Sequence, residues 1–173
     1  MAKLKYAKCL VNKPGPFPLE LQGKAGITAK ELIPGIKATH LMTTDEGVQK
    51  GFFSVDCTWL WSGAAREPVG EAHTHNFSHV IGFIGGHPAD PQDLGGEITV
   101  WLDGNKESLT RNCLIFIPAG VVHGPILFSK VNRPIFFVTL AMTGNTPAPL
   151  RCSQRLPKRR SIRLLTIPRR GSP

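Results

Sequence analysis

The chain of 173 residues has little tyrosine, little cysteine and no long apolar run. It holds one tyrosine and four cysteines, and no two of the cysteines, Cys9, Cys57, Cys113 and Cys152, form a C-x-x-C pair. We therefore expect free thiols rather than a disulfide framework. No stretch of about eighteen apolar residues exists, and the basic N-terminus lacks the apolar core of a secretory signal. These absences predict a cytoplasmic protein without a membrane partner.

The signatures of several enzyme classes are missing as well. The sequence contains no G-x-S-x-G nucleophile elbow, no phosphate-binding loop of the G-x-x-x-x-G-K-[ST] type and no dinucleotide fingerprint. It therefore gives no support to a serine hydrolase, a nucleoside triphosphatase or a nicotinamide-dependent dehydrogenase.

Acidic residues are absent from the C-terminal end. Residues 149–173 hold eight Lys and Arg, so the other 148 residues carry 13 of the 21 basic groups and all 12 acidic ones. The net charge of +9 thus belongs to a tail, and the rest of the chain is nearly neutral. We expect nucleic acid as a partner only through this tail, where no aromatic residue is interleaved to stack on bases.

From residue 36 onward the apolar residues alternate with a period of two, which is typical of strands. In FFSVDCTWLW the set of Phe53, Val55, Cys57, Trp59 and Trp61 is more apolar than the set between them. Asp103-Gly104 predicts a two-residue hairpin turn, because both residues tolerate a positive φ. Strands are predicted over 36–43, 71–75, 79–84, 97–102, 107–110, 113–117, 121–128 and 134–142.

This pattern predicts an all-β domain, a sandwich or barrel, over residues 36–145. An extended arm over 1–35, with one short helix at 27–33, precedes the domain, and a basic tail over 146–173 follows it. The loop over 85–96 is long for a hairpin connection, and we interpret it as a candidate lid at the mouth of the domain.

Three of the six histidines lie in EAHTHNFSHV, residues 71–80. On a strand His73 and His75 share one face, so their imidazoles can converge on one ion at about 2.0–2.2 Å. A tight connection over 76–78 lets His79 open the next strand, and a Pro-Gly turn over 118–120 delivers His123 to a neighbouring one. The residues alone leave open a metal site, a catalytic base with neighbours, or an accidental cluster.

Two motifs narrow this choice. HTHNFSH, followed by six residues and Gly86, resembles the first motif of the cupins, H-x-H-x3-E-x6-G, and PAGVVH (118–123) resembles the core of the second, P-x-G-x2-H. The resemblance covers about residues 50–142. It implies a small single-domain cupin, with a jelly-roll barrel or double-stranded β-helix. It also implies one metal held by His73, His75, His79 and His123, with His79 in place of the usual glutamate.

The resemblance further implies a divalent transition metal, Fe or Mn by preference, with Ni, Cu or Zn as alternatives. Four neutral imidazoles leave the charge of the metal uncompensated, which favours a small organic substrate that is anionic or enolisable. Cupins of this size include dioxygenases, and we expect a dioxygenase-like enzyme. A non-catalytic cupin that binds metal or a small ligand, and a metal-dependent isomerase or decarboxylase, remain as alternatives.

Two further expectations concern residues outside the ligand set. Glu71 has the same strand parity as His73 and His75, so it is a candidate catalytic base or orienting group, or else a solvated carboxylate. The extended arm over 1–35 suits the swapped arms and paired edge strands with which cupins often dimerise, so we expect a homodimer.

Overall fold

A computed structural model describes residues 33–44 and 53–141, and strand is the only extended regular element within these ranges. No helix in the described part is long and apolar enough to cross a membrane. The strands, in chain order, are β1 (Ile36–Thr44), β2 (Ser54–Gly63), β3 (His79–Gly85), β4 (Asp93–Leu102), β5 (Asn105–Arg111), β6 (Cys113–Ile117), β7 (His123–Val131) and β8 (Ile135–Ala141).

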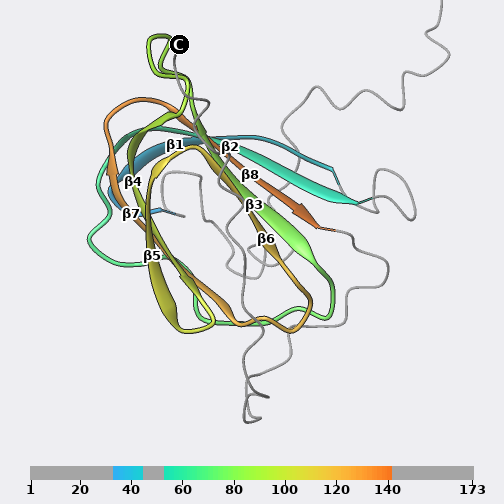
Figure 1. The fold of residues 1–173 in the computed structure, drawn as a ribbon. Helices are drawn as coiled ribbons and strands as arrows, with labels where there is room; N and C mark the ends of the chain where they lie inside the picture. Colours follow the sequence, from blue (N-terminus) through green and yellow to red (C-terminus); the bar gives the residue numbers. More distant parts are fainter. Residues whose placement is uncertain (1–32, 45–52, 142–173) are drawn as a thin grey trace, which may run out of the picture.

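The strand order is that of a jelly roll (Figure 1). Strands β2, β8, β3 and β6 lie side by side as one antiparallel layer, and β7, β4 and β5 form the other. The segment before β3 completes the second layer, because Val69 and His73 form bridges with Ile126 and His123 at β7. β1 extends the first layer beyond β2. The pairing confirms the all-β, jelly-roll barrel predicted from the sequence.

The core fills the space between the two layers. Phe83 of β3 stacks on Phe137 of β8 with ring centroids 5.2 Å apart, and it meets Phe128 of β7 edge-on at 6.4 Å. Leu60, Phe83 and Ile135 have no exposed surface. Burial of each such side chain contributes about 1.5–3 kcal/mol to folding, so this apolar interior holds the rim of the barrel, where the histidines lie, in place.

The more apolar side of β2 faces away from this core. Leu60 is fully buried and Thr58 is 9% exposed, so their parity marks the inward side, whereas Trp61 is 36% exposed. The polar Asp56 shares the inward parity. An apolar set that points outward is the reverse of the usual arrangement in an antiparallel sheet, where one face packs on the core and the other is solvated.

Several local predictions can now be compared with the structure. The hairpin at Asp103-Gly104 is confirmed, with φ values of 49° and 75° in the turn between β4 and β5. The strand predicted over 71–75 is wrong as a continuous element, because only the isolated bridge at His73 forms there. The predicted helix at 27–33 and the arm over 1–35 lie almost wholly outside the described residues. The tail over 146–173 lies entirely outside them, and these calls stay predictions.

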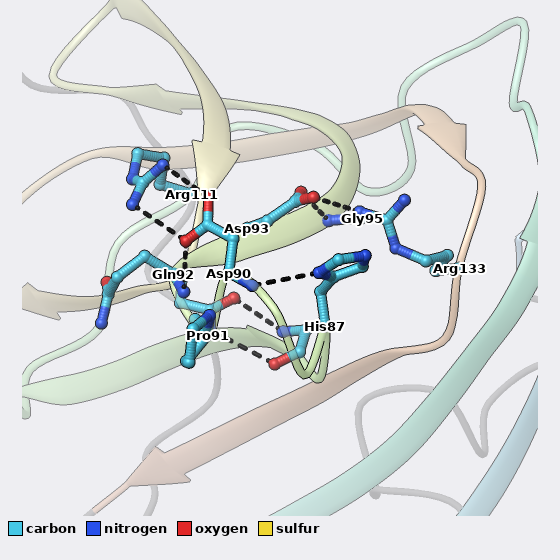
Figure 2. A network of polar contacts seen from close by, with 10 residues as sticks. His87, Asp90, Pro91, Gln92, Asp93, Gly95, Arg111 and Arg133 are labelled. Carbon is cyan, nitrogen blue, oxygen red and sulfur yellow. Dashed lines mark hydrogen bonds and ion pairs between the residues drawn. The ribbon is translucent and has the colours of Figure 1, made fainter.

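The loop after β3 is not a lid over the histidines. His79 begins β3 and Gly85 ends it, so six residues separate the two ends, or about 20 Å of extended strand. Polar contacts hold the loop against the far end of the barrel (Figure 2): Asp90 pairs with Arg111, and the Asn112 side chain donates to the carbonyls of Gly85 and Pro91. The loop therefore covers the end opposite the histidines.

Candidate metal centre

Three of the four predicted ligands meet at one end of the barrel. The ligand nitrogen atoms of His73, His75 and His123 all lie within 4.8 Å of one another. Two ligands at about 2.1 Å from one ion lie roughly 3.0–4.2 Å apart, so side-chain shifts of about 1 Å would bring these nitrogens into coordination range. The geometry therefore suits one ion shared by the three imidazoles.

Backbone hydrogen bonds join the two sequence motifs. His73 and His123 each donate their N–H to the carbonyl oxygen of the other, both at 3.0 Å. The N–H of Gly120 donates to the carbonyl of His75 at 2.8 Å, and the N–H of Ala119 donates to the Ser78 hydroxyl at 3.2 Å. The turn over 118–121 thus holds both motifs in register, and His123 begins β7 as the sequence predicted.

Main-chain carbonyls orient two of the imidazoles. His73 Nδ1 lies 2.7 Å from the carbonyl oxygen of Glu71, and His123 Nδ1 lies 3.0 Å from that of Val121. A carbonyl oxygen only accepts hydrogen bonds, so in both rings Nδ1 carries the proton and Nε2 keeps its lone pair. Hydrogen bonds of this kind are usual for histidines that bind metals.

The surroundings of the His123 Nε2 atom suit a bound metal ion. It is buried and has no hydrogen-bond partner among the described residues. A buried polar atom without a partner is costly, and an ion is one of the few groups that would satisfy it here. The donor set, neutral imidazoles with fixed tautomers, matches divalent transition metals.

His79 lies beside this group without being part of it. Its side chain is buried, and its ring centroid is 4.5 Å from that of His123 and 5.1 Å from that of His75. Its ligand atoms fall outside the 4.8 Å group, and its Nδ1 is buried without a partner. The structure therefore brings His79 to the site and leaves its role as a fourth ligand a prediction.

Burial keeps two of these histidines neutral. Burial, with smaller effects from the neighbouring imidazoles of His123, His75 and His73, lowers the pKa of His79 from 6.5 to about 3. Burial also lowers the pKa of His123 to about 4, against the opposing effect of the hydrogen bond to Val121. Metal ligands must be deprotonated, so both rings are ready to bind an ion at neutral pH.

These shifts predict an acid-sensitive metal-free protein. The folded pKa values of His79 and His123 lie below the unfolded value, so the unfolded chain takes up more protons as the pH falls below about 6.5. Between pH 7 and pH 5 we expect the free energy of unfolding to fall by about 1–2 kcal/mol for each histidine. Urea titrations of the metal-free chain at several pH values measure this change. The free energy of unfolding of His79→Gln should depend less steeply on pH than that of the wild type. An unchanged pH dependence in that variant would contradict the lowered pKa of His79 as its cause.

Glu71 contacts the site through its backbone. Its side chain is exposed, whereas its carbonyl oxygen accepts the hydrogen bond from His73. Gly124, with φ of 81°, lies against that carbonyl, and a Cβ atom there would be 2.8 Å from the oxygen. Glycine at 124 therefore leaves room for the carbonyl that orients His73, while a catalytic role for the Glu71 carboxylate stays a prediction.

A second buried polar cluster was not predicted from the sequence. His40 Nε2 lies 2.7 Å from the Asp56 carboxylate and 2.9 Å from the Thr43 hydroxyl, which donates to Asp56 at 2.7 Å. The His40 and Asp56 side chains are 6% and 14% exposed. Only the pairing of β1 with β2 brings His40 to Asp56.

No protein-family model and no curated protein matches the chain. Among solved structures it is similar to the polyketide cyclase RemF from Streptomyces resistomycificus, with 20% identity, 71% of this chain and 77% of that chain covered, and a TM-score of 0.43. It is also similar to a cupin 2 domain-containing protein from Halorhodospira halophila, with 19% identity, 75% and 76% covered, and a TM-score of 0.43. KdgF from Halomonas sp. has 20% identity, 64% and 81% covered, and a TM-score of 0.38.

Cupin-domain structures are thus among those that this barrel resembles. At these identities and TM-scores the likeness carries no argument about chemistry. The fold therefore rests on the strand pairing of the chain, and the site rests on the geometry of its histidines.

Proposed function

We propose that the chain is a mononuclear metal-binding cupin that acts as a dioxygenase-like enzyme on a small anionic or enolisable substrate. The observation that carries the proposal is the convergence of His73, His75 and His123 within 4.8 Å, with Nε2 of His123 buried and unpartnered. His79, beside them, is the proposed fourth ligand. Iron or manganese is the preferred metal, and nickel, copper or zinc would also suit imidazole donors.

In this proposal the residues of the chain hold the metal in position and leave its charge uncompensated, rather than supplying acid–base chemistry. Among the described residues, the four rings bring no carboxylate into the ligand set, so the positive charge of a bound ion would stay available to an anionic substrate. A redox-active metal here would supply Lewis acidity toward an enolate oxygen and electron transfer to dioxygen. The carbonyls of Glu71 and Val121 orient the rings of His73 and His123.

Elemental analysis of the purified full-length chain is the first test, followed by oxygen uptake with 2,4-pentanedione and related β-diketones. We expect about one Fe or Mn per chain and oxygen consumption that requires both metal and diketone. Failure to bind any divalent metal after reconstitution would overturn the whole proposal. Stoichiometric metal without oxygen uptake across such substrates would overturn the oxygenase part and favour the metal-binding or isomerase alternatives.

A further inference from the structure

The cluster of His40, Thr43 and Asp56 faces the interior of the barrel. Across the β1–β2 pair Thr43 lies opposite Asp56, and His40 lies opposite Thr58. Residues that are directly opposite in an antiparallel pair point to the same side of the sheet. Asp56 and Thr58 share the parity of the fully buried Leu60, so the whole cluster points inward.

An irregularity in β1 brings His40 and Thr43 to the same side of the sheet. The two residues are three positions apart, so in a regular strand their side chains would point to opposite faces. The register shifts between His40 and Met42, where Leu41 has no partner on β2. Bulges of this kind redirect side chains and are frequent next to active sites. The extra residue therefore allows both side chains to bond to Asp56.

One oxygen of the Asp56 carboxylate is left over from these bonds. Both hydrogen bonds, from His40 and from Thr43, go to Oδ2. Oδ1 has no donor among residues 33–44 and 53–141, and it is not fully enclosed, since the Asp56 side chain is 14% exposed. The two bonds to Oδ2 fix the carboxylate, so Oδ1 is presented to the interior of the barrel in one orientation.

Asp56 also differs from the other aspartates that form ion pairs in the described part of the chain. Asp90 and Asp93 each pair with an arginine, although their side chains are 50% and 35% exposed. Asp56 is less exposed than either, and its ion pair is with His40. A carboxylate with little access to water is stabilised by a nearby cation. The free oxygen therefore favours a ligand group that is positively charged and donates hydrogen bonds, such as an ammonium.

The cluster lies at the same end of the barrel as the histidines of the metal centre. Asp56 pairs with Thr139 on β8, which pairs with Ile81, two residues after His79 on β3. Two strand spacings and one step of two residues place the Cα atoms of Asp56 and His79 about 12 Å apart. On β8, between them, the inward residues are Thr139 and Ala141. Both are small, which leaves room for a small molecule that reaches Asp56 and the metal centre together.

We propose that Asp56 is a substrate-binding residue, whose Oδ1 accepts a hydrogen bond from an ammonium group of the substrate. The inference rests on the proposed function, because the metal centre binds the anionic or enolisable part of the same molecule. The substrate class is thus a small amino compound that is zwitterionic when its oxygen is ionised. His40 and Thr43 are positioning residues, which hold the carboxylate through Oδ2 and leave Oδ1 to the ligand.

Pairs of metal-chelating probes test the inference by isothermal titration calorimetry on the zinc-loaded full-length chain. β-Alanine hydroxamate and butanohydroxamate have the same size and chelating group, and they differ only in a terminal ammonium or methyl group. The pair of 4-aminobutanohydroxamate and pentanohydroxamate makes the same comparison with a longer reach. In at least one pair we expect the ammonium probe to bind the wild type at least about 10-fold more tightly. Asp56→Asn keeps the size of the side chain and removes its charge, so this preference should disappear.

The matched control is Asp90→Asn, which removes a carboxylate at the far end of the barrel and should keep the preference. A chain that takes up no zinc would overturn the proposed function, and this inference with it. A zinc-loaded chain that binds both members of each pair equally would overturn the inference alone. The same holds if the preference persists in folded Asp56→Asn, because another group would then bind the ammonium.

The wild type supplies a second readout if Asp56→Asn does not fold. The carbon-13 resonance of the Asp56 carboxyl group in the zinc-loaded chain should shift when an ammonium probe binds. It should shift far less with the methyl probe of the same length, which offers no donor to Oδ1. An equal response to the two probes would contradict a contact between Asp56 and the ligand.

Discussion

Replacing His123 by glutamine is expected to lower the affinity of the chain for a divalent metal by at least about 100-fold. Residues that merely orient a ligand already contribute 10- to 100-fold, and His123 would donate the coordinating atom itself. Its Nε2 is buried and unpartnered, so no other described residue stands ready to replace it. Glutamine is of similar size and stays neutral, which limits the change to the lost imidazole.

The measurement is a competition titration against a chelator of known affinity, with urea unfolding as a check on folding. His87→Gln is the matched control, because His87 accepts a hydrogen bond from the N–H of Asp90 in the loop at the far end of the barrel (Figure 2). That variant should bind metal as the wild type does. Wild-type affinity in a folded His123→Gln chain would refute the assignment of the site.

The same titration decides the role of His79. If it is the fourth ligand, His79→Gln should also lower the affinity, by about 10-fold or more. An unchanged affinity would restrict the ligand set to the three histidines whose nitrogens lie within 4.8 Å of one another.

Replacing Asp56 by alanine is expected to lower the free energy of unfolding by about 2–4 kcal/mol. The carboxylate accepts hydrogen bonds from His40 and Thr43, both at 2.7 Å, in a region of the barrel with little exposure to water. Its removal takes a charged hydrogen-bond partner from two side chains that are little exposed to water. Hydrogen bonds to a charged group contribute more to stability than ordinary ones, about 1.5–3 kcal/mol each.

Asp56→Asn is the control for this effect, since its amide oxygen can still accept from one of the two donors. We expect it to lose roughly half as much stability as the alanine variant in urea titrations with an unchanged m value. Metal affinity should stay near that of the wild type in both variants. Equal stability of the alanine variant and the wild type would show that the cluster contributes nothing to folding.

The sequence by itself determined the features that depend on neighbouring residues. Alternating apolar residues predicted strands, because side chains of a strand point to opposite faces. Asp103-Gly104 predicted its hairpin, because the turn requires positive φ at both positions. The resemblance of the two histidine motifs to those of the cupins predicted that the histidines meet, and the structure brings His73, His75 and His123 together. The jelly-roll barrel followed from these motifs through a family resemblance.

The tertiary structure alone decided what depends on strands that are distant in sequence. Alternation in FFSVDCTWLW cannot say which side meets the core, and the pairing of β2 with β8 turns the more apolar side outward. His40 and Asp56 are sixteen residues apart, and only the register of β1 on β2 joins them. The sequence of the loop over 85–96 does not indicate at which end of the barrel the loop lies. These properties arise from long-range pairing and burial, whose energies belong to the folded barrel and not to any local stretch of the chain.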